Sequence, residues 1–247
     1  MGELFEVLAG GGVAPQVAAR VRARIARMTA DARLPVTAVR ARLTTVEAAS
    51  GLLVAQVNAE VAGRRIRVQV AAAQVHAVVD RLVKRLAERF AQTADGWAPR
   101  LWPASARTAS ARPAPRLPRA GDRRIVRVKE PELVWCRPEA AAWTMDAMDY
   151  DIHLFTDAET EADAVVYRVG PTGYGLARTV AAGPPPHRGV PFTLSPRPVP
   201  HLTRDQAAAR MVKVGLPFLF FTDPECGLGR VLYRRFDGGL GLIAGAT

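Results

Sequence analysis

Phe155-Thr156-Asp157-Ala158-Glu159 returns later in the chain as Phe221-Thr222-Asp223-Pro224-Glu225. Two more segments repeat at the same distance: Val165–Arg168 (VVYR) returns as Val231–Arg234 (VLYR), and Gly173–Leu176 (GYGL) returns as Gly239–Leu242 (GLGL). The offset is 66 residues each time, as the step from 155 to 221 shows, and no gap is needed. Ala141, Ala142 and Met145 fall on Ala207, Ala208 and Met211 at this offset. A match of this length indicates a duplicated module.

The repeated pattern begins with a helix rich in Ala and Met and continues with a strand, an acidic turn, a second strand that ends in VVYR, and a Gly-x-Gly-Leu finish. This pattern resembles the C-terminal domain of the long-type ribosome hibernation-promoting factors, also known as the sigma-54 modulation protein or ribosome-associated inhibitor family. The resemblance implies a protein that binds ribosomes and is not an enzyme. In this chain the C-terminal domain occurs twice.

The first 95 residues predict the element order strand, helix, three strands, helix. The period-two alternation of Val39, Ala41 and Leu43 with Arg40 and Arg42 indicates a sheet with one buried and one wet face. We expect strands at Leu4–Ala9, Val36–Leu43, Leu52–Val61 and Arg65–Val70, and helices at Pro15–Ala30 and Ala73–Gln92. The predicted fold class is α+β, with an N-terminal βαβββα domain (a four-stranded sheet with two helices on one face), a flexible linker and two small α/β repeat modules.

Charge separates the chain into parts. The net charge of +11 and the isoelectric point near 10.8 favour an anionic partner. Residues 1–95 carry 14 Lys/Arg and 8 Asp/Glu, whereas residues 96–129 carry 9 and 1. Residues 130–247 carry 11 Lys/Arg against 14 Asp/Glu, so the anion-binding half is the N-terminal half.

From these segments we expect five parts. Residues 1–95 form a basic domain, which the resemblance implies binds ribosomal RNA, and residues 96–129 form a disordered linker rich in Pro, Arg and Ala. Copy 1 of the module spans residues 130–180 and is acidic, a Pro-rich link spans 181–202, and copy 2 spans 203–247 and is basic.

The order of elements in the N-terminal half also resembles the N-terminal domain of the hibernation factors. That resemblance implies binding in the decoding channel of the small ribosomal subunit, where the domain would block mRNA and tRNA, inhibit translation and protect idle ribosomes. The implied partners are 16S rRNA and small-subunit proteins, in the cytoplasm. The residues that match by their place in the fold are basic: Arg20, Arg22, Arg24, Arg27, Arg40, Arg42, Arg65, Arg67, Arg81, Lys84, Arg85 and Arg89.

In long hibernation factors the module forms a homodimer that joins two ribosomes. Here one chain holds both copies, so the link raises their mutual effective concentration to about the millimolar range. Residues 130–177 carry 2 Lys/Arg and 10 Asp/Glu, whereas residues 203–247 carry 6 and 4, which favours pairing of unlike copies. We therefore expect an intramolecular pair on single ribosomes. The predicted contact residues are Ile152, Leu154, Phe155, Val165, Tyr167, Phe218, Phe220, Phe221, Val231 and Tyr233.

Other interpretations carry less support. The carboxylates between Asp146 and Asp163 lack a known metal-ligand spacing and indicate a solvated acidic face. We expect no metal and no cofactor, and no nucleophile, base and orienting group can be assembled. No apolar run is long enough to span a bilayer, and no signal peptide is expected at the start. The alternative function is a protein-interaction regulator, for example of transcription, with incidental affinity for RNA.

Overall fold

The computed structural model describes residues 5–10, 12–46, 51–99, 124–169, 173–186 and 189–246. It divides the chain into two compact units. The N-terminal unit is built on residues 1–98, and the C-terminal unit contains both copies of the repeat.

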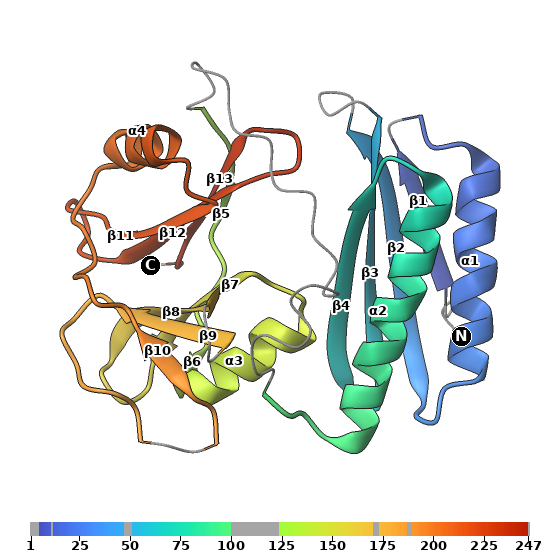
Figure 1. Ribbon diagram of the computed structural model, residues 1–247, viewed down its shortest axis with the longest axis horizontal. Coiled ribbons are helices and arrows are strands. Elements are labelled where there is room, and N and C mark those ends of the chain that lie inside the picture. Colours follow the sequence, from blue (N-terminus) through green and yellow to red (C-terminus); the bar gives the residue numbers. More distant parts are fainter. Residues whose placement is uncertain are drawn as a thin grey trace. The chain divides into compact units, whose positions relative to one another are not determined.

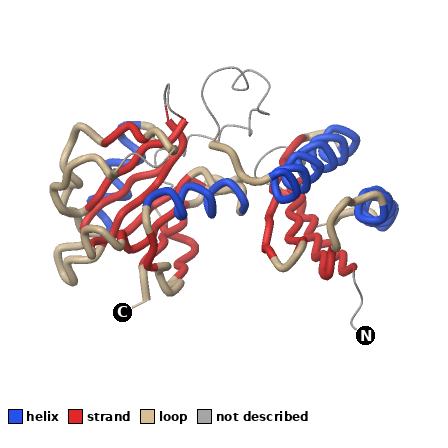
Figure 2. The backbone as a smooth tube through the Cα atoms, turned by 90° about the horizontal axis from the view of Figure 1, so that it is seen from below, coloured by secondary structure: helices blue, strands red, loops and turns tan. Residues whose placement is uncertain are grey.

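The N-terminal unit has one sheet with two helices on a single face, as Figures 1 and 2 show. The strands lie in the order β1-β2-β3-β4, with β1 parallel to β2 and the other neighbours antiparallel. The elements are β1 (Phe5–Gly10), α1 (Pro15–Ala30), β2 (Val36–Val46), β3 (Leu52–Val61), β4 (Arg64–Ala72) and α2 (Val75–Asp95). The predicted α+β fold of this part is confirmed.

Local sequence explains these elements. Pro15 stands in the first turn of α1, where its missing N–H costs nothing, and Val21 and Ile25 turn towards the sheet and are buried. The hairpin between β3 and β4 turns at Ala62 and Gly63, whose φ angles are 49° and 72°. Such a two-residue turn with positive φ matches the twist of the strands it joins.

The C-terminal unit has two sheets, each carrying one helix. The copy 1 sheet has the order β10-β9-β8-β7-β6, and the copy 2 sheet has the order β11-β12-β13-β5. Figure 1 shows the layers of this unit as α4, the copy 2 sheet, the copy 1 sheet and α3. The elements are β5 (Ile125–Lys129), β6 (Trp135–Cys136), α3 (Pro138–Ala147), β7 (Ile152–Asp157), β8 (Ala162–Val169), β9 (Gly173–Arg178), β10 (Phe192–Leu194), α4 (Arg204–Val214), β11 (Phe218–Thr222), β12 (Gly229–Arg234) and β13 (Leu240–Ala244).

The two copies exchange a strand. β5 precedes copy 1 in the chain but pairs in parallel with β13 of copy 2, and β10 precedes copy 2 but pairs in parallel with β9 of copy 1. The register repeats with the 66-residue offset: Leu194 lies opposite Leu176, and Val128 lies opposite Leu242. Each sheet is therefore completed by the strand that precedes the other copy in the sequence.

These two strands correct the expected linkers. Ile125–Lys129 lies at the end of the stretch expected to be disordered, and Phe192–Leu194 lies inside the expected Pro-rich link, yet both are strands. Each is short and lies beside Pro- or Arg-rich sequence, and each is held in a strand by the sheet edge against which it pairs. Residues 100–123 of the expected linker, with Trp102, lie outside the described residues.

The repeated Tyr and Gly-x-Gly motifs face each other across neighbouring strands. Tyr167 lies opposite Gly175, and Tyr233 lies opposite Gly241. A Cβ added to either glycine would collide with the facing tyrosine ring. The ring lies over the bare backbone, which explains why both motifs recur together in each copy.

A half-buried histidine predicts a pH dependence for the stability of copy 1. Burial lowers the pKa of His153 on β7 to about 4, and its ring stacks near Tyr150 and Phe155 with centroids 6.0 and 6.3 Å apart. The unfolded chain takes up this proton near pH 6.5 and the folded chain does not, so stability present above pH 6.5 is lost as the pH falls towards 4. We expect the free energy of unfolding to fall by about 1.4 kcal/mol per pH unit in that window.

The measurement is urea unfolding of the full chain at about pH 7 and about pH 5.5, followed by hydrogen exchange of copy 1 peptides. The variant His153→Phe is the control, because it keeps the apolar contacts and removes the titrating group. An equal loss of stability on acidification in both proteins would contradict the assignment.

Candidate functional site

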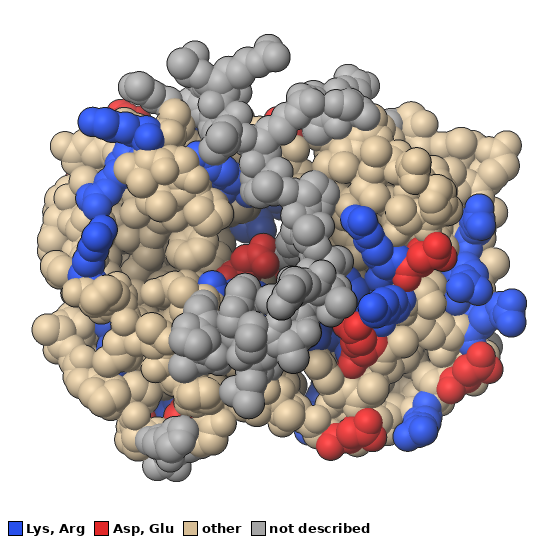
Figure 3. Space-filling view, viewed as in Figure 1, with Lys and Arg blue, Asp and Glu red and all other residues tan. Residues whose placement is uncertain are grey.

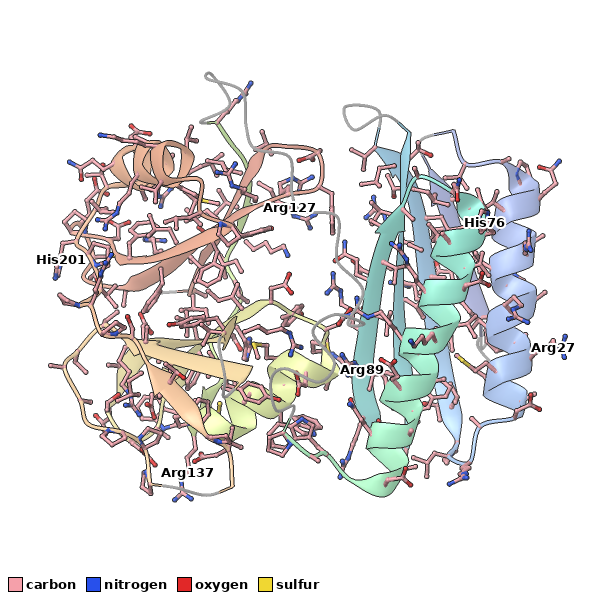
Figure 4. All side chains as sticks on the ribbon, in the orientation of Figure 1. Arg27, His76, Arg89, Arg127, Arg137 and His201 are labelled. Atoms are coloured by element: carbon pink, nitrogen blue, oxygen red, sulfur yellow. The ribbon has the colours of Figure 1, made fainter. Side chains whose placement is uncertain are left out.

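The arginines of α1 form an exposed basic face. Arg20, Arg22, Arg24 and Arg27 are all at least partly exposed, and the spacing of Arg20, Arg24 and Arg27 places these three on one side of the helix. Arg27 points outward in Figure 4. Figure 3 shows Lys and Arg side chains over α1 and α2, with a few acidic side chains among them.

Some basic residues of α2 are exposed, and some form hydrogen bonds within the N-terminal unit. Arg81 and Lys84 are both exposed. Nη1 of Arg81 also donates a hydrogen bond to the carbonyl oxygen of Ala71 at 3.3 Å. Arg85 is half-buried, and its Nη1 donates to the carbonyl oxygen of Gln69 at 3.3 Å. These bonds hold both guanidinium groups near the edge strand β4.

Arg89 corrects one expectation. We predicted it on the outer face of α2, but the residue is only 2% exposed and Nη1 donates to Oε1 of Gln92 at 2.6 Å. Its guanidinium bonds to its own helix, three residues towards the C-terminus. Arg89 (labelled in Figure 4) is therefore not part of the accessible basic surface in this structure.

A second basic face lies on the side of the sheet that the helices leave open. Arg40, Arg42 and Arg65 are exposed, and Arg67 is half-buried. Nε of Arg40 forms an ion pair with Oε2 of Glu6 at 2.5 Å, and Nη2 of Arg67 donates to Oε1 of Gln56 at 3.2 Å. Local partners thus hold part of this face.

A groove hollows the helical side of the N-terminal unit. It has a volume of about 510 Å³ and lies between the C-terminal parts of α1 and α2. Arg24, Arg27 and Arg33 line it together with apolar residues such as Phe90. Its three arginines can contact an anionic backbone, although most of the lining is apolar and Asp31 and Asp95 also reach its wall.

The predicted pairing residues gather between the two sheets of the C-terminal unit. Leu154, Val165, Phe220 and Val231 form one buried cluster, which we term the pairing cluster. Partly buried residues from both copies pack against it: Leu133, Ile152, Tyr167, Ala177, Val199 and Ile243. The rings of Tyr167 and Phe218 also meet across the copies, with centroids 5.5 Å apart. The structure therefore brings most of the predicted contact residues together.

Two predicted contact residues, Phe155 and Phe221, lie in the cores of their own copies. Phe221 packs in the core of copy 2, with Met211 of α4 and Leu232. Phe155 holds the equivalent place in copy 1 and is fully buried outside the pairing cluster. Because neighbouring residues on a strand point to opposite faces, Leu154 and Phe155 cannot both face the partner sheet. Tyr233 is two residues from Val231 on β12 and therefore shares its face, and Nζ of Lys129 lies 5.6 Å from the centroid of its ring.

Each copy has a buried ion pair at the same aspartate of the repeat, but the arginine comes from a different strand in each copy. Nε of Arg178 on β9 lies 2.7 Å from Oδ2 of Asp157, and Nε of Arg230 on β12 lies 2.6 Å from Oδ2 of Asp223. The two aspartates are equivalent in the repeat, but the arginines are not. Across the strands, Arg178 faces Ala164 in copy 1, whereas Arg230 faces Ala244 in copy 2. Asp157 is fully buried, so the expected solvated acidic face is wrong for this residue.

This geometry predicts that an arginine at either of the two facing strand positions can pair with the buried aspartate. Arg178→Ala leaves the Asp157 carboxylate buried without its cation, and we expect a loss of about 3 kcal/mol in the free energy of unfolding of the C-terminal unit. Adding Ala164→Arg to that variant copies the copy 2 arrangement and is expected to recover most of the loss. Urea unfolding measures both effects.

The matched control is Arg197→Ala, which removes an exposed arginine from the link and is expected to change stability by less than about 0.5 kcal/mol. A double variant no more stable than Arg178→Ala would show that the two positions are not interchangeable.

The described residues hold no group of three His, Cys, Asp or Glu side chains arranged to bind a metal ion. None of the helices in the described ranges combines the length and apolar character needed to cross a membrane.

Comparison with known proteins identifies the architecture. The sequence pattern of the family described as Sigma 54 modulation/S30EA ribosomal protein C terminus matches twice, at residues 120–176 and 196–242. The chain is 40% identical over 249 residues to the "Dormancy associated translation inhibitor" of Mycobacterium tuberculosis, in strains CDC 1551 and H37Rv. The alignment covers 96% of this chain and 86% of each relative.

The chain belongs to the long-type ribosome hibernation factor family. Members of this hibernation factor family are not enzymes, so the chain is not an enzyme. The first match of the family pattern includes β5, the strand that pairs with copy 2, and the second match begins just after β10. The doubled C-terminal domain of this hibernation factor is therefore evident from pattern and fold alike.

Two solved structures match part of this chain. The N-terminal domain of Protein Y from Thermus thermophilus is 18% identical, with a TM-score of 0.32 over 37% of this chain and 99% of that chain. A ribosomal subunit interface protein from Coxiella burnetii is 12% identical, with a TM-score of 0.32 over 37% of this chain and 98% of that chain.

Proposed function

We propose that this chain inhibits translation by filling the decoding channel of the small ribosomal subunit, where it blocks mRNA and tRNA and protects the idle ribosome. The observation that carries the proposal is the 40% identity to a translation inhibitor across 96% of the chain. The N-terminal unit supplies the binding surface, in contact with 16S rRNA and small-subunit proteins in the cytoplasm.

The chemistry of that surface favours recognition of folded RNA by shape and charge. The arginines of the α1 face can each donate two parallel hydrogen bonds to phosphate oxygens. Phe5 and Phe90, in contrast, pack against the core and are poor stacking platforms for unpaired bases. Binding through phosphates releases counterions and therefore weakens steeply as salt rises.

The C-terminal unit supports action on single ribosomes. The pairing cluster is shared by the two copies of one chain, and each copy completes its sheet with a strand from in front of the other. A module whose pairing face is already occupied has no equivalent face to offer to a second chain. We therefore propose that the factor occupies one ribosome and does not join two.

The experiment is a competition on isolated small subunits. A labelled mRNA with its initiator tRNA is bound first or last, and the amount retained is measured against increasing protein at several salt concentrations. Loss of both ligands at one protein per subunit, with easier recovery at high salt, supports occlusion. Retention of mRNA and tRNA on subunits saturated with the protein would contradict it.

A further inference from the structure

One contact between the two copies connects two residues that occupy the same position of the repeat. Oδ2 of Asp163 on β8 accepts a hydrogen bond from the backbone N–H of Gly229 on β12, at 2.7 Å. The step from 163 to 229 is 66, the offset of the repeat, so the two residues are equivalent. Such a meeting of equivalent residues is typical of two copies related by an approximate twofold axis.

The space at this contact admits one side chain and not two. A Cβ added to Gly229 would lie 2.7 Å from Cβ of Asp163 and 2.9 Å from Cε2 of Phe220. Gly229 is buried, and its N–H finds its acceptor in the carboxylate of the other copy.

The same place would be occupied differently in a pair of like copies. Two copies of copy 1 would bring two Asp163 side chains together, which adds like-charge repulsion to the steric clash. Two copies of copy 2 would bring two glycines together and leave the buried N–H groups without the carboxylate. Only the unlike pair has one acceptor, one donor and the room for both.

The pairing cluster shows a second asymmetry of the same kind. Leu154 in copy 1 corresponds to Phe220 in copy 2, and Ala177 corresponds to Ile243. In both of these pairs the smaller member belongs to copy 1. A pair of like copies would therefore bring together either two smaller residues, which leave a void, or two larger ones, which overfill the space.

We propose that Asp163 and Gly229 determine pairing specificity, so that copy 1 accepts copy 2 and both reject their own kind. This inference rests on the proposed pairing within one chain and adds the residues that enforce it. The two copies would then pair within one chain because of these residues and not only because the link joins them.

The test uses the full chain with a protease recognition sequence inserted between Pro185 and Pro186 of the link. After cleavage, the fragment with the N-terminal unit and copy 1 is held to the copy 2 fragment by non-covalent contacts alone. Size-exclusion chromatography and fluorescence titration then give the dissociation constant. The cleaved wild-type fragments are expected to stay together.

Gly229→Asp is expected to weaken that association about 100-fold or more, since it places two carboxylates at one site. The exchange variant Asp163→Gly/Gly229→Asp restores one carboxylate and one glycine with their places reversed. We expect it to return to within about tenfold of the wild-type constant. Circular dichroism of the uncut chains checks that each variant is folded.

The outcomes separate the two proposals. Wild-type fragments that part on cleavage would overturn pairing within the chain, and the specificity inference with it. Association that survives Gly229→Asp unchanged, or an exchange variant no better than Gly229→Asp, would overturn the specificity inference alone. Occlusion of the decoding channel is measured separately on small subunits and does not depend on either result.

Discussion

Replacing Arg20, Arg24 and Arg27 of α1 together by alanine is expected to weaken binding of the chain to small ribosomal subunits about 100-fold at physiological salt. These residues form one side of α1, and Arg24 and Arg27 also line the groove beside α2. Removing one phosphate-binding side chain lowers the slope of log affinity against log salt by about one, so the slope should fall by about three. Filter binding from about 50 to about 300 mM salt measures both quantities.

The matched control removes the same charge from copy 2. Arg204, Arg210 and Lys213 are exposed on α4, and their replacement by alanine changes the net charge equally. We expect this control to bind small subunits within about threefold of the wild type. Equal losses in the two triple variants would show that net charge alone, and not the α1 face, governs binding.

Phe220→Ala is expected to lower the free energy of unfolding of the C-terminal unit by about 3 kcal/mol or more. Phe220 is 7% exposed and fills the pairing cluster between the two sheets, so its truncation removes apolar burial and leaves a cavity. Because the cluster is shared, the loss should appear in both copies. Hydrogen exchange measures it as roughly 100-fold faster exchange of amides in both β8 and β12.

Val214→Ala serves as the control for that variant. Val214 is 60% exposed at the end of α4, and its truncation is expected to change exchange rates in β8 and β12 by less than about threefold. Faster exchange in β12 alone after Phe220→Ala would mean that Phe220 supports only its own copy.

The sequence predicts the regular elements well where local signals agree. The expected helix Pro15–Ala30 and strand Leu52–Val61 match α1 and β3 residue for residue. Pro at the helix start, a clean apolar stripe and strict alternation all point to the same elements. The 66-residue repeat likewise predicts two equivalent modules with one helix each.

The remainder depends on tertiary pairing that the local sequence does not reveal. β5 and β10 are strands because each lies against the last strand of the other copy, which no local pattern shows. The run Phe218-Leu219-Phe220-Phe221 is apolar on both faces, so periodicity cannot decide that Phe220 faces the other sheet and Phe221 faces α4. The contact of Asp163 with Gly229 follows from the repeat only once the two copies are seen face to face.

Sedimentation of intact ribosomes with the full chain through a sucrose gradient tests the central claim most directly. A stoichiometric amount of protein is added, and the fractions are probed for it. Hibernation on single ribosomes predicts co-migration with the single-ribosome peak and no growth of a ribosome-dimer peak. Protein in a dimer peak would contradict pairing within one chain, and protein left at the top of the gradient in moderate salt would contradict ribosome binding itself.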